Sequence, residues 1–232
     1  MLLKPESILK FLPKEIELKQ RLIFDSIRFT IEMIECSFFE LNMNLEKLAL
    51  RRTKRNLPQI FLYAWSIIDN VKRFIALNKK LPSKDEHSYL NSLRKVVEFR
   101  NTFQHLDERI DEVLFLQQAP FYGALVWEYK NQATNGVEIF IALSGIRYSK
   151  THEFKVTEYK NLEHPINNIR LESVNKKNKI IINLNELYRA LFSVIEFLEK
   201  DLKNQLSSMN LNSFDWKDHR DNLLIIKNEK KN

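Results

Sequence analysis

Three polar residues whose side chains could bind an anion or transfer a proton lie close together in one predicted helix. Arg100 occupies a position where the spacing of Leu93 and Val96 favours an apolar side chain. Asn101 follows it, and His105 lies four residues beyond Asn101, on the same side of a helix. A guanidinium on an apolar face needs a partner, and it can hold an oxyanion. An imidazole exchanges a proton near neutral pH. The spacing therefore predicts a site with acid–base and anion-binding chemistry.

Hydrophobic residues recur at helical spacing in four segments. These predicted helices cover residues 14–50, 56–77, 83–114 and 183–206. We expect a break in the first helix near Asn42, where polar residues cluster. Asn56, Ser83 and Asn183 are expected to cap the other three helices. The third helix carries the Arg100 motif, so the other helices must position it.

After Pro120 the chain changes to short segments rich in aromatic and β-branched residues. The predicted strands cover residues 121–130, 137–144, 152–159, 167–173 and 179–184. The pair Asn135-Gly136 predicts a tight hairpin between the first two strands. Trp127 and Phe140 alternate along the strands as core residues do, which favours packing over a base-stacking platform.

These elements predict a mainly α fold, an up-down four-helix bundle with an antiparallel β insertion between helices three and four. The helical bundle would comprise residues 1–116 and 184–232. The insertion, residues 117–183, would be a small antiparallel sheet that projects from one end of the bundle.

The composition excludes several classes of protein. The 232 residues include three glycines, all after residue 122, which argues against a glycine-rich phosphate loop in the first half. The single cysteine, Cys36, excludes an internal disulfide and is expected to be a small buried residue. No apolar run reaches transmembrane length, and no signal-peptide core is evident, so we expect a cytoplasmic protein.

The net charge of +7 and the pI near 9.3 favour a polyanionic partner such as RNA. A basic patch follows the first predicted helix, and its members are Arg51, Arg52, Lys54 and Arg55. These residues are candidates for RNA binding. A solvated linker face is the alternative interpretation.

The segment Arg100-Asn101-Thr102-Phe103-Gln104-His105 resembles the motif of the HEPN superfamily. Members of that family are small helical bundles with an arginine, a polar residue, a short spacer and a histidine in the C-terminal half of one helix. The resemblance covers residues 14–116 and 184–206 and does not extend to the β insertion. Many HEPN proteins are metal-independent ribonucleases of toxin–antitoxin, phage-defence and RNA-processing systems, and others only bind.

The resemblance implies a homodimer in which two motifs face each other. His105 would act as general base and acid, Arg100 would stabilise the phosphorane, and Asn101 would support them. RNA cleavage by the 2′-OH would leave a 2′,3′-cyclic phosphate with neither metal nor cofactor. RNA and a cognate antitoxin protein would be the partners, and we expect no membrane association.

Two observations limit this interpretation. The arginine could instead form a structural ion pair with Asp69, which would fit a catalytically silent dimeric module that binds RNA or protein. Asp69 is also spaced for a surface pair with Arg73. A second match to the motif spacing joins Arg147 and His152 in the predicted sheet, and we interpret it as fortuitous.

Overall fold

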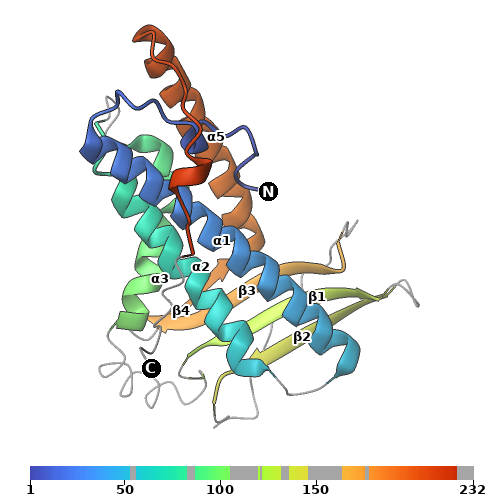
Figure 1. Ribbon diagram of the computed structural model, residues 1–232. Helices are drawn as coiled ribbons and strands as arrows, with labels where there is room; N and C mark the ends of the chain where they lie inside the picture. Colours follow the sequence, from blue (N-terminus) through green and yellow to red (C-terminus); the bar gives the residue numbers. More distant parts are fainter. Residues whose placement is uncertain are drawn as a thin grey trace, which may run out of the picture.

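The computed structural model describes residues 1–52, 56–82, 87–104, 120, 122–131, 136–145, 164–175 and 178–223. Within these residues, four α-helices pack against one four-stranded sheet (Figure 1). In chain order the elements are η1 Ile8–Lys10, α1 Leu18–Arg51, α2 Leu57–Asn78, η2 Ser88–Leu93, α3 Arg94–Gln104, β1 Ala124–Asn131, β2 Gly136–Leu143, β3 Ile166–Asn175, β4 Asn178–Asn183, α5 Leu184–Ser208 and η3 Lys217–His219. The predicted strand at 152–159 lies outside the described residues.

Helix α1 is continuous over its 34 residues, so the break expected near Asn42 is absent. The side-chain amides of Asn42 and Asn44 donate to the carbonyls of Phe38 and Glu40, one turn earlier. These bonds satisfy the two side-chain amides inside the helix, so the amides do not draw the backbone into a non-helical conformation. Cys36 is exposed on this helix, which corrects the expectation that it is buried.

Helix α2 begins where the sequence predicts, but not with the expected cap. Asn56 occupies the cap position with a φ of 69° and makes no side-chain capping bond. Asparagine tolerates this left-handed conformation, which turns the chain from α1 into α2. Pro58 lies in the first turn, where its missing N–H costs nothing.

The third predicted helix is only partly α-helical. Residues 88–93 form the 3₁₀ helix η2, and the α-helix α3 runs from Arg94 to Gln104. The proposed cap at Ser83 and the region from 105 to 114 lie outside the described residues. The Arg100 motif thus begins in the last described turns of α3.

The four strands are antiparallel neighbours in the order β2-β1-β3-β4. The predicted antiparallel pairing of the first two strands is present, and its last pair joins Asn131 of β1 to Gly136 of β2. The turn between them, residues 132–135, lies outside the described residues. Trp127 is buried and stacks on Phe140 with ring centroids 5.4 Å apart. These aromatics are therefore part of the packing of the sheet, as predicted.

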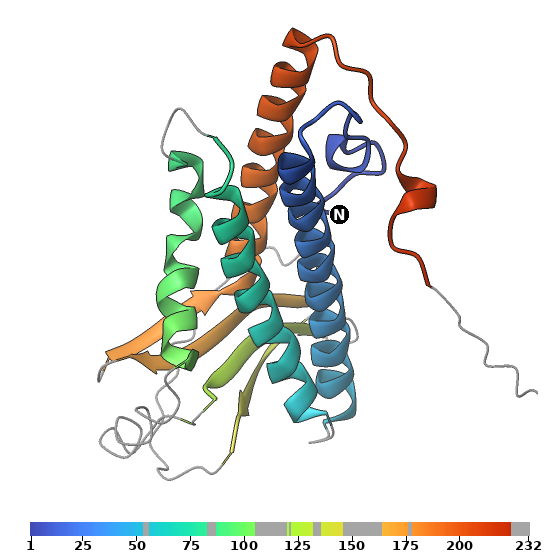
Figure 2. The ribbon, with the colours of Figure 1, turned by 60° about the vertical axis from the view of Figure 1, so that its left-hand side comes forward.

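The sheet lies against the helices and shares one hydrophobic core with them, instead of projecting from an end (Figure 2). Leu125, Ile169 and Leu171 from the strands are fully buried in the same cluster as Ile31 and Val71 from the helices. Burying one apolar face of a small sheet against helices removes that face from water, which a projecting sheet could not do.

Helix α5 is capped as the sequence predicts. The Asn183 side chain accepts hydrogen bonds from the backbone N–H groups of Asn185 and Glu186. Beyond α5 the chain returns along η1, where the Trp216 indole donates to the carbonyl of Leu12 at 2.7 Å. No helix within the described residues is long and apolar enough to cross a membrane.

Glu128 of β1 is a buried carboxyl whose ionisation opposes folding. Burial raises its pKa above the usual value of about 4.5, although a hydrogen bond from Asn168 and the charge of Arg170 act in the opposite direction. The folded state therefore binds a proton more tightly than the unfolded state does. The contribution of Glu128 to the stability of the fold is therefore favourable at low pH. It is lost as the pH rises from about 4.5 through the higher folded-state pKa.

We predict that Glu128→Gln raises the melting temperature at pH 7 and has a smaller effect near pH 4. The amide keeps an oxygen that can accept from Asn168 and removes the buried charge. Thermal unfolding of both proteins from pH 4 to pH 8 measures the difference. An equal effect at all pH values would contradict this account of Glu128.

Candidate functional site

Arg100 projects from α3 toward α2 and pairs there with Asp69. Its Nε donates to Asp69 Oδ1 at 2.8 Å, with the two side chains 22% and 31% exposed. The neighbouring packing fixes this approach: Phe99 is buried and lies beside Trp65 of α2, with ring centroids 5.5 Å apart. The partner anticipated as the structural alternative is therefore the one observed.

The ion pair with Asp69 uses the Nε–H of the guanidinium. Arg100 Nη1 is buried and has no hydrogen-bond partner within the described part of the chain. A buried donor without an acceptor costs about 1–3 kcal/mol. An anion that reached Nη1 would remove this cost, and its charge would interact favourably with the guanidinium.

Asn101 and Lys72 extend the polar cluster along the same side. Lys72 Nζ on α2 donates to Asn101 Oδ1 at 3.3 Å, and Asn101 is exposed. Arg100, Lys72 and Asp69 together carry a net charge of +1, and Asn101 adds a neutral amide. This arrangement favours the approach of an anion.

The surface pair expected between Asp69 and Arg73 is absent. Arg73 Nη1 instead donates to Asn70 Oδ1 at 3.2 Å, while Asp69 turns to Arg100. Lys72 was not predicted as part of this cluster, and its spacing of three residues from Asp69 was the available signal.

His105 lies outside the described residues, one position beyond Gln104, the last residue of α3. Arg147 and His152, the fortuitous second match, lie outside them too. The structure thus places Arg100 and Asn101 of the predicted catalytic set, and the role of His105 stays a prediction.

The predicted RNA-binding patch does not join Arg100. Arg51 ends α1 and is exposed, and Arg52 is 71% exposed and pairs with Glu138 of β2 at 3.1 Å. Lys54 and Arg55 lie outside the described residues. Helix α2 lies between α1 and α3 in both views (Figures 1 and 2), and the pair with Glu138 places Arg52 beside β2.

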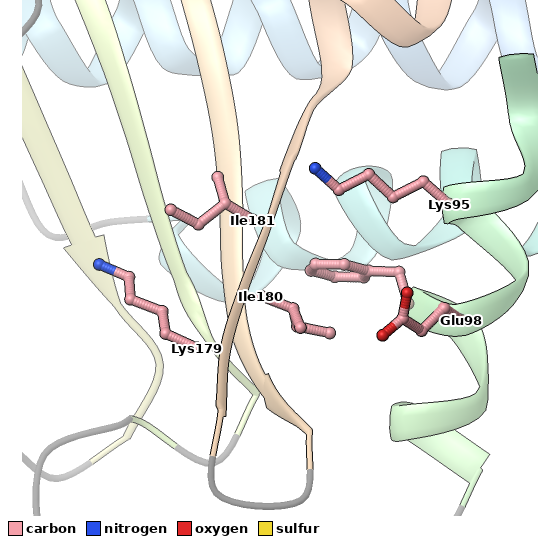
Figure 3. A pocket seen from close by; sticks show the side chains of 6 residues that line it. Lys95, Glu98, Lys179, Ile180 and Ile181 are labelled. Carbon is pink, nitrogen blue, oxygen red and sulfur yellow. The ribbon is translucent and has the colours of Figure 1, made fainter.

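A small cavity of about 170 Å³ lies between α3 and β4. Figure 3 shows Lys95 and Glu98 of α3 on one side, and residues of β4 on the other. Lys179 of β4 already forms an ion pair with Glu172 at 2.6 Å. The volume is below the roughly 300–1,000 Å³ of typical small-molecule sites, so this cavity is not a strong candidate for a ligand pocket.

Comparisons of the chain with protein-family models, curated proteins and solved structures returned no match. The motif and the geometry around Arg100 are therefore the features that bear on function.

Proposed function

We propose that this protein is a metal-independent endoribonuclease of HEPN type that acts in the cytoplasm as a toxin or phage-defence effector. One observation supports this function best. Asp69 holds the Arg100 guanidinium through Nε, while Nη1 of the same group is buried without an acceptor within the described residues. Such a guanidinium is oriented in advance and can donate a hydrogen bond to a phosphate oxygen.

The proposed reaction is an internal transfer at phosphorus. The RNA 2′-oxygen forms a bond to the adjacent phosphorus and gives its proton to His105 of one copy. The bond from phosphorus to the 5′-oxygen breaks, and His105 of a second copy gives that oxygen a proton. Arg100 neutralises the extra charge of the phosphorane, and Asn101 orients the histidine or a phosphate oxygen. The products are a 2′,3′-cyclic phosphate and a 5′-OH.

RNA would be held by electrostatic attraction before it reacts. The net charge of +7 supports this, as do the exposed side chains of Arg51 and Arg52. Lys54 and Arg55 are assigned to the same role from the sequence. A cognate antitoxin protein would then neutralise the cleavage activity.

The ion pair itself favours a second candidate, a catalytically silent HEPN-like dimeric module that binds RNA or a protein. In such a module the contact between Arg100 and Asp69 would serve only to join α3 to α2. The two candidates differ in whether RNA is cleaved.

Incubation of the protein with mixed RNA in EDTA tests the proposal. We expect fragments with cyclic phosphate and 5′-OH ends, and no cleavage at a position where a 2′-deoxynucleotide replaces the ribonucleotide. Binding without cleavage would favour the silent module. Cleavage that leaves 5′-phosphate ends, or that EDTA abolishes, would contradict the proposed mechanism.

A further inference from the structure

Helix α1 exposes apolar side chains along the face opposite to its core. Five of them recur every seventh residue, and two more lie between. We define the α1 stripe as Leu22, Phe29, Met33, Cys36, Phe39, Met43 and Leu50. Leu22, Phe39 and Leu50 are each about 60% exposed, and Phe29 is 47% exposed.

This stripe is unusual because α1 already buries its other face. Ile27, Ile31 and Ile34 of α1 are completely buried in the core. A surface helix normally turns polar residues to the opposite side. Contiguous exposed apolar surface marks an interaction site, and a seven-residue repeat is the spacing at which two helices pack along their length.

The order of residues in the stripe indicates which partner fits. The stripe is self-complementary about Cys36: Leu22 and Leu50 are equally distant from it. Phe29 and Met43 are also equidistant, and so are Met33 and Phe39 in the printed sequence. An antiparallel two-fold pairing centred on Cys36 would therefore place leucine against leucine and phenylalanine against methionine. A symmetric interface has this property, since each contact occurs twice.

The charges beside the stripe favour the same orientation. Asp25 and Lys47 are equidistant from Cys36, and both are exposed. Antiparallel pairing would set each Asp25 against a Lys47, whereas parallel pairing would set like charges together. Glu32 would face Glu40. Arg28 pairs with both Asp25, at 2.9 Å, and Glu32, at 2.6 Å, so it weakens the favourable and the unfavourable contact alike.

We infer that two copies of this chain pair antiparallel through the α1 stripe, with the two-fold axis at Cys36. The stripe from Leu22 to Leu50 is about 42 Å long at the rise of an α-helix. Helix α2 lies between α1 and α3 (Figures 1 and 2), so this pairing leaves the Arg100 region open. It is a separate interface from the one in which two His105 residues would face each other, and it does not depend on the proposed ribonuclease function.

The first experiment measures the molar mass of the full chain by light scattering or sedimentation at about 1–100 μM. We expect an assembly of at least two copies, and Phe29→Glu together with Phe39→Glu should halve its molar mass with an unchanged helical circular dichroism signal. Phe197→Glu is the matched control, because Phe197 is 49% exposed on α5 and stacks on Tyr89 of η2. A wild-type monomer at 100 μM, or a molar mass that the two glutamates leave unchanged, would overturn the inference.

The second experiment determines the orientation. Mild oxidation should cross-link the wild type through Cys36, the single cysteine of the chain. In a Cys36→Ser background, a mixture of Leu22→Cys and Leu50→Cys proteins should form mixed cross-linked dimers, while each protein alone should not. Cross-linking of each variant with itself, and none in the mixture, would show parallel pairing and overturn the antiparallel arrangement.

Discussion

Replacement of His105 by alanine is expected to lower the rate of RNA cleavage by at least about 100-fold, since general acid–base catalysis contributes about 10²–10⁴-fold. Arg100→Ala should cause a loss of about 10²–10³-fold by removing the group that meets the phosphorane charge. Arg100→Lys keeps the charge but not the planar donor set, so it should restore only part of the activity. Single-turnover cleavage of one labelled RNA measures all three.

The second motif match supplies the control for these variants. His152→Ala removes a histidine with the same spacing from an arginine and should leave the rate unchanged. The stability of Arg100→Ala should be measured by thermal unfolding as well, because this change also breaks the ion pair with Asp69. Asp69 is 31% exposed and regains water, so we expect a stability loss within about 1 kcal/mol. Equal cleavage by wild type and His105→Ala would remove this motif from the mechanism.

Gly123→Ala is expected to destabilise the fold by about 2–5 kcal/mol, as judged from left-handed backbone strain plus overpacking. Gly123 precedes β1 with a φ of 90°, where a β-carbon would lie 2.3 Å from the carbonyl oxygen of Glu172 in β3. That oxygen belongs to a paired strand and cannot move aside without disturbing the sheet. Equilibrium denaturation in urea measures the loss.

Gly145→Ala separates the two contributions. Gly145 has a φ of 87°, but a β-carbon there would have no neighbour within 4 Å. The Gly145→Ala variant should therefore be destabilised only by backbone strain, by about 1–2 kcal/mol. If the two alanine variants were equally stable, the close approach of β3 to Gly123 would have no energetic importance.

Local patterns predicted the elements well wherever one short stretch of sequence decides the outcome. The hydrophobic spacing located α1, α2 and α5 to within a few residues. The β-branched and aromatic runs predicted the paired strands β1 and β2, and Asn183 predicted the α5 cap. The prediction of an α-helix was wrong for residues 88–93, because a 3₁₀ helix differs little in its apolar spacing from the start of an α-helix.

The sequence by itself determined that a guanidinium and an amide occupy adjacent positions on the third helix, beside a buried apolar face. Only the tertiary structure decided that Asp69 pairs with Arg100 instead of Arg73, because the packing of α3 on α2 sets which side chains meet. The packing of the sheet against the helices and the exposure of Cys36 were likewise decided by long-range contacts. Helical spacing shows which residues share a face, but the other elements of the fold determine whether that face is covered.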